Sequence, residues 1–316
     1  MMHRRSKLSV IGAGSVGSSL AYASLIRGSA DEVVLQDINA ALVDAEVLDI
    51  AHGAPLAGRS TIGGGADIEV TEGSDVIVVT AGAKQRPGQT RLDLAGVNAR
   101  ILDGMIPRLV ELSPDAVIVL VTNPCDVLTV LAAERADLPA GRVFSSGTVL
   151  DSSRLRNAIA RHTEVPSSEV QAVVLGEHGD SAFSHWSQAT VAGVPVEEWR
   201  LSDGSAPVTP ALRDAIDHEV VTAAYRVIEG KGATNYAIGL SGARIVEAVL
   251  HDEGAVLPVS SPLDGVHGIT GVALSLPSVV GASGVARVVD VALTDDELDR
   301  LHRSAGAIAD AVDALH

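Results

Sequence analysis

The chain has 316 residues, of which 47% are apolar and only 2% aromatic, and its formal net charge is −17. This length allows one large or two ordinary domains with an aliphatic core, and the acidic balance argues against a nucleic-acid partner, since phosphate binding needs clustered Lys and Arg. The single cysteine, Cys125, excludes an intrachain disulfide and argues against a cysteine-based metal site, so we expect no metal.

The N-terminal region allows two interpretations. Residues 3–7 are basic, residues 8–26 carry no charge, and Ala21-Tyr22-Ala23 resembles a cleavage site, which together fit a secretory signal. The alternative, which we favour, is a buried strand at residues 8–11 followed by a glycine-rich turn and a helix. No other uncharged stretch is long enough to span a bilayer, and we expect a cytoplasmic protein.

The glycine-rich turn has the spacing of a dinucleotide-binding fingerprint. Gly12-Ala13-Gly14-Ser15-Val16-Gly17 follows the first strand, and residues 18–27 have a helical pattern. Gly12 permits a tight turn, Gly14 lets a pyrophosphate approach the backbone, and Gly17 lets the helix pack closely on the strand. The helix N-terminus offers free N–H groups to the phosphates. Taken alone, the motif equally describes a glycine-rich turn without a ligand.

Asp37 supports the interpretation of the glycine-rich turn as a dinucleotide-binding site. It ends the second expected strand, residues 33–37, and lies 20 residues after Gly17. An acid here is expected to bind the adenosine ribose hydroxyls and to repel a 2′-phosphate, which favours NAD over NADP. The competing interpretation is an N-cap for the helix that begins near Ala40. Because the fingerprint precedes it, we favour the ribose contact.

Strands and helices go on alternating through the first half. We expect strands at residues 76–80, 116–121 and 143–146, and helices at residues 40–52, 93–112 and 126–135. Uninterrupted apolar strands are typical of a parallel sheet buried on both faces, and the alternation predicts a doubly wound α/β fold. Ligands of such sheets bind beyond the carboxyl ends of the strands, where we expect Gly12, Asp37, Gly82, Asn123 and Ser146.

A group of candidate catalytic residues follows. His178 lies between glycines and acids in Gly176-Glu177-His178-Gly179-Asp180, Asp151 and Arg154 lie upstream, and Arg91 ends a charged loop. They provide an imidazole to move a proton, a carboxylate to orient it, and two guanidinium groups to hold an anion. The structural alternatives are a turn histidine bonded to its own backbone, a surface salt bridge between Asp151 and Arg154, and an exposed loop arginine. The combination favours catalysis.

Taken together, these motifs resemble the lactate/malate dehydrogenase family, and within it the bacterial L-lactate type. The resemblance rests on GAGSVG, the Q-x-P-G-x-T-R loop, TNP, D-x-x-R, GEHGD and KGAT at residues 231–234, and runs from about residue 8 to the C-terminus. It implies a Rossmann NAD-binding domain at residues 1–146, a mixed α/β substrate domain at residues 147–316, NAD as cofactor, and a homo-oligomer, expected to be a tetramer.

The resemblance also implies roles for individual residues. His178 would be the acid/base, with Asp151 holding its ring, Arg154 gripping the substrate carboxylate, and Arg91 polarising the C2 carbonyl. Asn123 would lie near the reacting oxygen and the nicotinamide, and Thr234 would line the substrate pocket. Further residues implied to contact the cofactor are Val16, Gly82, Ala83 and Ser146, beside Gly12, Gly14, Gly17 and Asp37.

Gln85 indicates the substrate, because this position is Gln in lactate dehydrogenases and Arg in malate dehydrogenases of the family. A neutral amide accepts the methyl end of pyruvate but does not compensate the second carboxylate of oxaloacetate. We therefore expect reversible hydride transfer between NADH and pyruvate, giving L-lactate. A malate dehydrogenase is the nearest alternative, and a non-catalytic NAD-binding protein is a more distant one.

One position departs from the pattern of many bacterial relatives, which are activated by fructose 1,6-bisphosphate bound to an arginine and a histidine at a subunit interface. Arg156 matches the arginine, but Gln171 occupies the position of the histidine. We therefore predict weak or absent activation.

The second half has a mixed pattern. We expect strands within residues 165–175 and 182–196, helices at residues 210–230 and 234–250, and antiparallel strands between residues 255 and 293. Thr294 and Glu297 form a predicted capping box at the start of a last helix.

Overall fold

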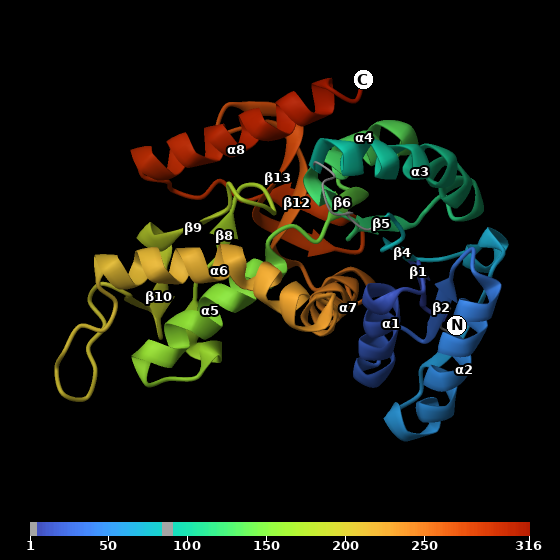
Figure 1. The fold of residues 1–316 in the computed structure, drawn as a ribbon, viewed down its shortest axis with the longest axis horizontal. Helices are drawn as coiled ribbons and strands as arrows, with labels where there is room; N and C mark the ends of the chain where they lie inside the picture. The colour runs from blue at the N-terminus through green and yellow to red at the C-terminus, as the bar shows by residue number, and fades with distance from the viewer. Residues whose placement is uncertain (1–4, 84–90) are drawn as a thin grey trace.

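The computed structural model describes residues 5–83 and 91–316 (Figure 1). Nine strands of this part of the chain form one sheet in the order β14-β13-β12-β6-β5-β4-β1-β2-β3. Six of them run parallel: β1 (Lys7–Ile11), β2 (Glu32–Gln36), β3 (Thr61–Gly65), β4 (Val76–Val79), β5 (Val117–Leu120) and β6 (Val143–Ser145). Their order, β3-β2-β1-β4-β5-β6, is that of a doubly wound dinucleotide-binding sheet, so the predicted fold class is confirmed.

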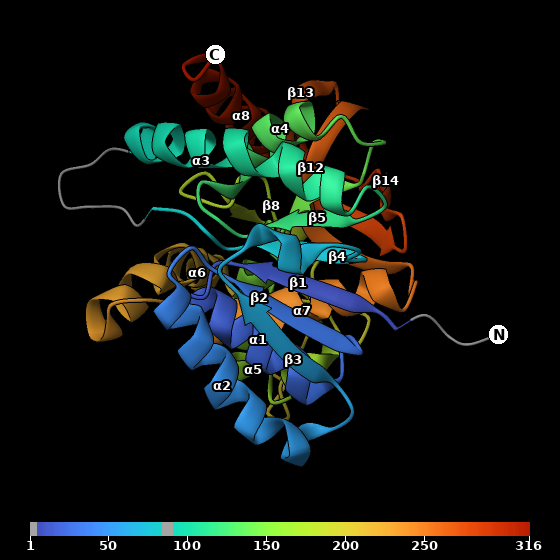
Figure 2. The ribbon, with the colours of Figure 1, turned by 90° about the vertical axis from the view of Figure 1, so that its right-hand side faces the viewer.

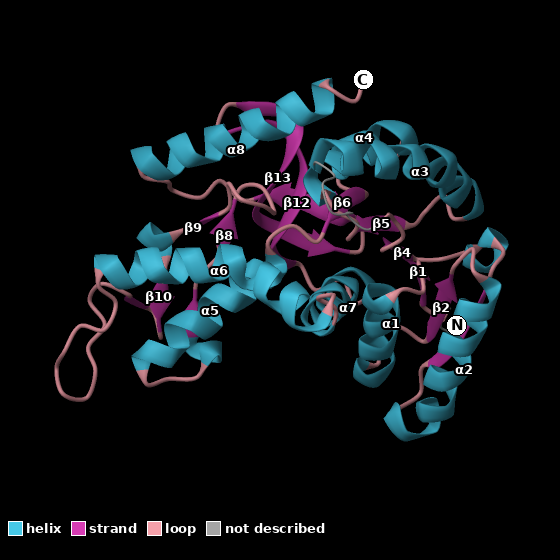
Figure 3. Cartoon of the chain, in the orientation of Figure 1, coloured by secondary structure: helices cyan, strands magenta, loops and turns pink. Residues whose placement is uncertain are grey.

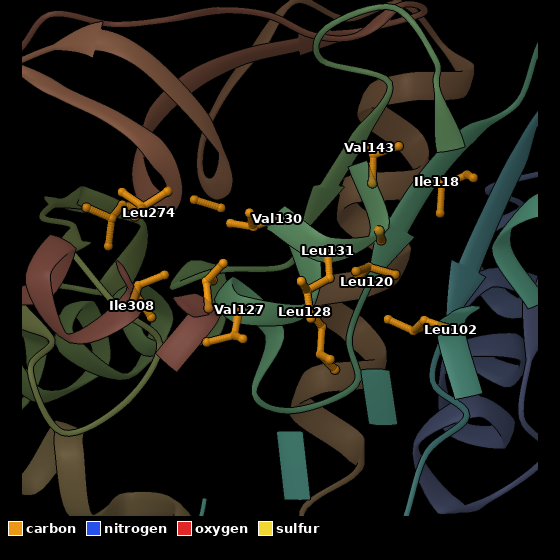
Figure 4. Close-up of a cluster of buried hydrophobic side chains, with 14 of the residues drawn as sticks. Leu102, Ile118, Leu120, Val127, Leu128, Val130, Leu131, Val143, Leu274 and Ile308 are labelled. Carbon is orange, nitrogen blue, oxygen red and sulfur yellow. The ribbon is translucent and has the colours of Figure 1, made fainter. Parts of the chain in front are cut away.

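Helices cover both faces of the parallel strands (Figure 2). One face packs against α3 (Arg91–Leu112), α4 (Cys125–Ala136) and α8 (Asp295–Asp313), and the other against α1 (Ser15–Arg27), α2 (Ala40–Ala57) and α7 (Tyr236–Leu250). Alternate residues of β4 and β5 therefore enter two different cores. Figure 4 shows part of the first core, in which Ile118 and Leu120 of β5 lie near side chains of α3 and α4. Burial on both faces explains why these strands are apolar at every position.

The N-terminal stretch that also fits a secretory signal belongs to the folded core. Residues 8–26 form most of β1 and α1, and the side chains of Leu8, Val10 and Leu20 are fully buried. Within the described residues, no helix has the length and apolarity needed to cross a membrane.

One parallel strand was missed by the sequence analysis. β3 has the sequence TIGGG, whose three glycines give no apolar alternation to recognise. The glycines have a packing reason, because a Cβ on Gly64 would lie 2.0 Å from the carbonyl oxygen of Leu35 in β2. Glycine at this position therefore allows close contact between the backbones of β3 and β2, while Ile62 of β3 packs against the core.

The second half of the chain extends the same sheet. β12 (Ala255–Val266), β13 (Ile269–Gly281) and β14 (Gly284–Val288) form an antiparallel group that joins β6 through the pairing of Ser260 with Ser145. The antiparallel strands expected between residues 255 and 293 are thus confirmed. The capping box at Thr294 is confirmed as well, since its side chain accepts from the Glu297 N–H.

The remaining elements surround a smaller core at one side of the sheet (Figure 3). α5 (Val149–Thr163) and α6 (Pro210–Lys231) pack there beside short strands. These strands are β7 (Val170–Gln171), β8 (Val174–Leu175), β9 (Phe183–Ser184), β10 (Thr190–Val191) and β11 (Val194–Pro195). Single 3₁₀ turns occur at η1 (Ile68–Thr71), η2 (Ser167–Glu169) and η3 (Trp186–Gln188). α5 carries two of the candidate site residues, Asp151 and Arg154.

Candidate active site

The glycine-rich turn after β1 has the close packing that its spacing predicts. Gly12 adopts a φ of 101°, and a Cβ on it would lie 2.8 Å from the backbone nitrogen of Ala81. A Cβ on Gly17 would lie 1.8 Å from the carbonyl oxygen of Gly12, so only glycine lets α1 approach β1. Gly14 differs, because nothing described lies within 4 Å of its Cβ position. An open backbone surface at the N-terminus of α1 fits a pyrophosphate group.

Asp37 holds this turn from the next strand. One carboxylate oxygen accepts from the N–H of Ala13 at 2.7 Å, and the other accepts from the N–H of Asn39 at 2.9 Å. The competing helix-cap interpretation is wrong, because the N-cap of α2 is Asn39, whose side chain accepts from the Leu42 N–H. The half-buried carboxylate keeps lone pairs for a ribose hydroxyl. Together with the space over Gly14, these residues fit the adenosine and phosphate parts of NAD.

The loops after β4, β5 and β6 meet at the same edge of the sheet. Asn98 of α3, which is only 1% exposed, joins two of them: its Oδ1 accepts from the Ala83 N–H at 2.8 Å, and its Nδ2 donates to the Asn123 carbonyl at 2.8 Å. Asn98 was not identified from the sequence. Ser146 follows β6, where its N–H donates to the Leu120 carbonyl. The predicted cofactor contacts Gly82, Ala83, Asn123 and Ser146 therefore lie at strand ends, as expected, and Val16 lies half-buried in the first turn of α1.

Three of the four candidate catalytic residues, His178, Asp151 and Arg154, come together around the Asp151 carboxylate. Its Oδ2 lies 2.6 Å from Nδ1 of His178, and its Oδ1 accepts from Nη1 of Arg154 at 2.8 Å. The Asp151 side chain is 8% exposed and that of Arg154 is 18% exposed, so this is not a surface salt bridge. The imidazole of His178 is bound to a side chain, which also excludes a turn histidine bonded to its own backbone.

Local features of the sequence explain the positions of Asp151, Arg154 and His178. Asp151 lies in the first turn of α5, where a carboxylate is favoured by the helix dipole, and Arg154 follows one turn later on the same face. His178 lies on the loop between β8 and β9, held by a second acid: its backbone N–H donates to Oδ2 of Asp126 at 2.7 Å. Asp126 is 1% exposed and was not identified from the sequence.

The charges determine the protonation state of the imidazole. Burial lowers the pKa of His178, but the charge and hydrogen bond of Asp151 and the charge of Asp126 outweigh it and raise that pKa to about 9. For Asp151, burial raises the pKa, whereas His178 and Arg154 lower it more, so the net shift is downward. At neutral pH the site therefore holds an imidazolium next to a carboxylate, which is a proton donor with a fixed orientation.

Arg154 faces a cavity of about 880 Å³ that Thr234 also lines. Arg156, which matches the arginine that binds fructose 1,6-bisphosphate in many bacterial relatives, lines the same cavity. Gln171 lies on β7, where its Oε1 accepts from Oγ1 of Thr190 at 3.0 Å. Gln85 and the side chain of Arg91 lie outside the described part of the structure. Among residues 5–83 and 91–316, no group of three or more His, Cys, Asp or Glu side chains could hold a metal ion.

Comparison with known proteins covers nearly the whole chain. Residues 6–145 match the family model for the lactate/malate dehydrogenase NAD binding domain, and residues 148–315 match the model for its alpha/beta C-terminal domain. An L-lactate dehydrogenase of Bifidobacterium animalis subsp. lactis is 47% identical over 95% of this chain and 93% of its own length. One from Thermoanaerobacterium saccharolyticum is 43% identical over 98% of this chain and 99% of its own length.

Solved structures give the same result for the fold. The minor L-lactate dehydrogenase of Enterococcus mundtii, solved with ligands bound, superposes with a TM-score of 0.93 at 36% identity, covering 98% of both chains. A lactate dehydrogenase from a Medee basin deep-sea metagenome superposes with a TM-score of 0.94 at 34% identity, covering 99% of both chains.

Proposed function

Because the chain belongs to the lactate/malate dehydrogenase family, we propose that it is an NAD-dependent L-lactate dehydrogenase whose proton-transfer group is His178. The observation that carries this proposal is the double contact of Asp151, which joins the imidazole on one side and Arg154 on the other. A proton donor and an anion holder thereby have a fixed separation, as a substrate with a carboxylate next to a carbonyl requires.

Each group has a distinct task in pyruvate reduction. One N–H of Arg154 is engaged by Asp151, and its other donors remain for the substrate carboxylate. NADH, when bound, would supply the hydride for C2. Nε2 of His178 gives its proton to the carbonyl oxygen as negative charge develops there. Asp151 keeps the ring oriented with Nε2 toward the substrate and stabilises the imidazolium beforehand. In lactate oxidation, neutral His178 takes the proton back.

Four further residues bind the substrate or the cofactor in this proposal. Arg91 polarises the C2 carbonyl and stabilises the negative charge that develops on its oxygen. Asn123 lies near the reacting oxygen and the nicotinamide, and Thr234 lines the substrate end of the cavity. The adenosine ribose binds Asp37, whose negative charge selects NAD over NADP. We place the boundary between the NAD-binding and substrate domains at residues 146 and 147.

Gln85 selects pyruvate over oxaloacetate, and this can be tested directly. We compare kcat/KM for both substrates with NADH in the wild type and in Gln85→Arg. The wild type should prefer pyruvate, and Gln85→Arg should shift the preference toward oxaloacetate, because its charge compensates the second carboxylate. A wild type that prefers oxaloacetate would contradict the proposed substrate, and one that binds NADH without turning over either substrate would indicate a non-catalytic NAD-binding protein.

We further propose that the chain works as a homo-oligomer, as a tetramer in the cytoplasm, where glycolysis supplies pyruvate and NADH. Large apolar side chains remain exposed on α1, on α2 and just before α2: Leu56 of α2 is 91% exposed, and Ile38, which precedes α2, is 94% exposed. A second exposed group lies around α6 and α7: Tyr225, Val227, Ile228, Tyr236 and Leu240. Light scattering should give four times the 32.4 kDa of one chain; a monomer would contradict the assembly.

A further inference from the structure

Helices α1 and α7 pack against each other although they come from different halves of the chain (Figure 1). α1 belongs to the part that matches the NAD binding domain, and α7 to the part that matches the C-terminal domain. Glycines allow the close approach: a Cβ on Gly239 would lie 2.8 Å from the carbonyl carbon of Ser19, and one on Gly242 would lie 2.3 Å from Cδ1 of Leu20. The two helices therefore form one closely packed unit across the two halves.

The contacts show that α1 and α7 run in the same direction. Ser19 lies against Gly239 near the start of both helices, and the guanidinium of Arg27 meets the carboxylate of Glu247 near their ends. Both N-termini thus lie at the same end of the pair. The N-terminus of α1 is the open backbone proposed for the pyrophosphate, and Thr234, two residues before α7, lines the substrate cavity. One helix pair therefore carries both proposed binding sites at one end.

An ion pair holds the other end of the helix pair together. Arg27 donates from Nε and Nη2 to the two carboxylate oxygens of Glu247, each at 2.6 Å, and Ser29 donates to Oε1 at 3.0 Å. The Glu247 side chain is 10% exposed. Burial raises its pKa, but the hydrogen bonds of Arg27 and Ser29 lower that pKa more, so the carboxylate stays charged at neutral pH. The C-terminal ends of α1 and α7 are therefore fixed to each other.

At the end near the binding sites, the polar contact between the helices is made by Asn235. Its Nδ2 donates to Oγ of Ser19 at 2.8 Å, and its Oδ1 accepts from Nζ of Lys231. Asn235 occupies the N-cap position of α7, where an asparagine side chain usually accepts from a backbone N–H of the first turn. Among the described residues it forms no such bond. Its amide group instead joins the start of α7 to α1 and to the end of α6.

We propose that Asn235 is a positioning residue for substrate binding: its hydrogen bond to Ser19 fixes Thr234, the preceding residue, relative to the N-terminus of α1. The inference rests on the proposed roles of Thr234 and of the glycine-rich turn, and adds a residue that connects them. Because the amide of Asn235 is occupied by Ser19 and Lys231, it acts through Thr234 rather than on the substrate. NADH binding orders the N-terminus of α1, and the hydrogen bond carries this order into the first turn of α7.

A double-mutant cycle tests this connection kinetically. Asn235→Ala and Ser19→Ala each remove one partner of the hydrogen bond. Each should raise KM for pyruvate about fivefold, while kcat and the affinity for NADH alone change less than about twofold, because the bond orders the pocket and touches no reacting atom. The double variant should resemble either single variant. Additive effects of the two substitutions, or a KM that stays at the wild-type value, would overturn the proposal.

Ser241→Ala is the matched control. The Ser241 hydroxyl also lies on α7 and the residue is 8% exposed, but it donates within its own helix, to the carbonyl of Ala237 at 2.9 Å. Loss of this hydroxyl should leave KM for pyruvate unchanged. A rise equal to that of Asn235→Ala would show that any disturbance of α7 has the same effect, and would overturn a specific role for Asn235.

Hydrogen exchange measured by mass spectrometry tests the same connection without pyruvate. At the start of α7, the N–H of Gly239 donates to the Asn235 carbonyl at 2.8 Å. In the wild type, NADH should slow the exchange of backbone amides severalfold at residues 14–19 and also at residues 236–240. In Asn235→Ala, NADH should slow exchange at residues 14–19 only. If that variant does not fold, Ser19→Ala removes the same bond from α1.

The exchange pattern distinguishes failure of this inference from failure of the proposed function. Protection of residues 236–240 that persists in the variants, or that NADH does not produce in the wild type, would overturn the inference alone. Exchange at residues 14–19 that NADH leaves unchanged would contradict the proposed cofactor site and the inference with it.

Discussion

Replacing Asp151 by Asn should alter the proton affinity of His178 strongly. The carboxylate oxygen lies 2.6 Å from Nδ1, and its charge and hydrogen bond are the main influences that raise the pKa of His178 to about 9 from 6.5. That difference corresponds to about 3 kcal/mol in favour of the imidazolium. In Asp151→Asn, burial and the charge of Arg154 remain and lower the pKa, whereas the charge of Asp126 remains and raises it. Because burial is the largest of these influences, the pKa should fall to 6.5 or below.

The consequence for pyruvate reduction follows from the protonated fraction. At pH 7.5 almost all of the wild-type His178 is protonated, whereas a pKa of about 6.5 leaves roughly a tenth in that form. kcat/KM for pyruvate should therefore fall about tenfold from protonation alone, and further because the amide no longer selects one ring orientation.

The assay is the pH profile of kcat/KM for pyruvate with NADH between pH 5 and 10. The wild-type profile should decline above about pH 9, and that of Asp151→Asn above about pH 6.5. Asp203→Asn, which changes an exposed carboxylate distant from the site, is the control and should match the wild type. An Asp151→Asn profile that still declines near pH 9 would refute the assignment of His178 and Asp151 as a coupled pair.

Three further predictions concern the cofactor, the reverse reaction and regulation. Gly14→Ala should fold normally but bind NADH more weakly in a fluorescence titration. Gly17→Ala should lose thermal stability, because its Cβ would lie 1.8 Å from a backbone oxygen. If both variants lost stability and NADH affinity to the same extent, the assignment of Gly14 to the phosphate site would be contradicted. Lactate oxidation needs neutral His178, so its kcat/KM should rise as the pH approaches 9, opposite to pyruvate reduction; parallel profiles would argue against a shared acid/base. Millimolar fructose 1,6-bisphosphate should leave KM for pyruvate unchanged, since Gln171 cannot carry the positive charge of a histidine; a large decrease in KM would show that a different cation binds the phosphate.

The parallel sheet could be predicted from the sequence because its strands follow local rules. β4 and β5 are apolar throughout, and the glycine fingerprint marks the end of β1. β3 was missed because its glycines reflect contact with β2, a partner about thirty residues away along the chain, and leave no periodic pattern. Nor does periodicity predict that β12 joins β6 and makes the second half part of the same sheet.

The candidate site likewise contains residues that the sequence predicts and residues that it does not. His178, Asp151 and Arg154 lie in short motifs that can be recognised together, and the structure brings them into contact. Asp126 and Asn98 have no such motif, since an acid or amide in a helix usually faces solvent or acts at a helix end. Their importance depends on partners far along the chain, and this becomes visible only when burial and hydrogen bonds are known.

The most direct test is a crystal structure with NADH and oxamate, an unreactive mimic of pyruvate. The account predicts the oxamate carboxylate on the Arg154 guanidinium, its carbonyl oxygen within hydrogen-bond distance of Nε2 of His178, and the nicotinamide ring alongside. Oxamate bound away from both side chains, or a nicotinamide at the opposite end of the groove, would contradict it.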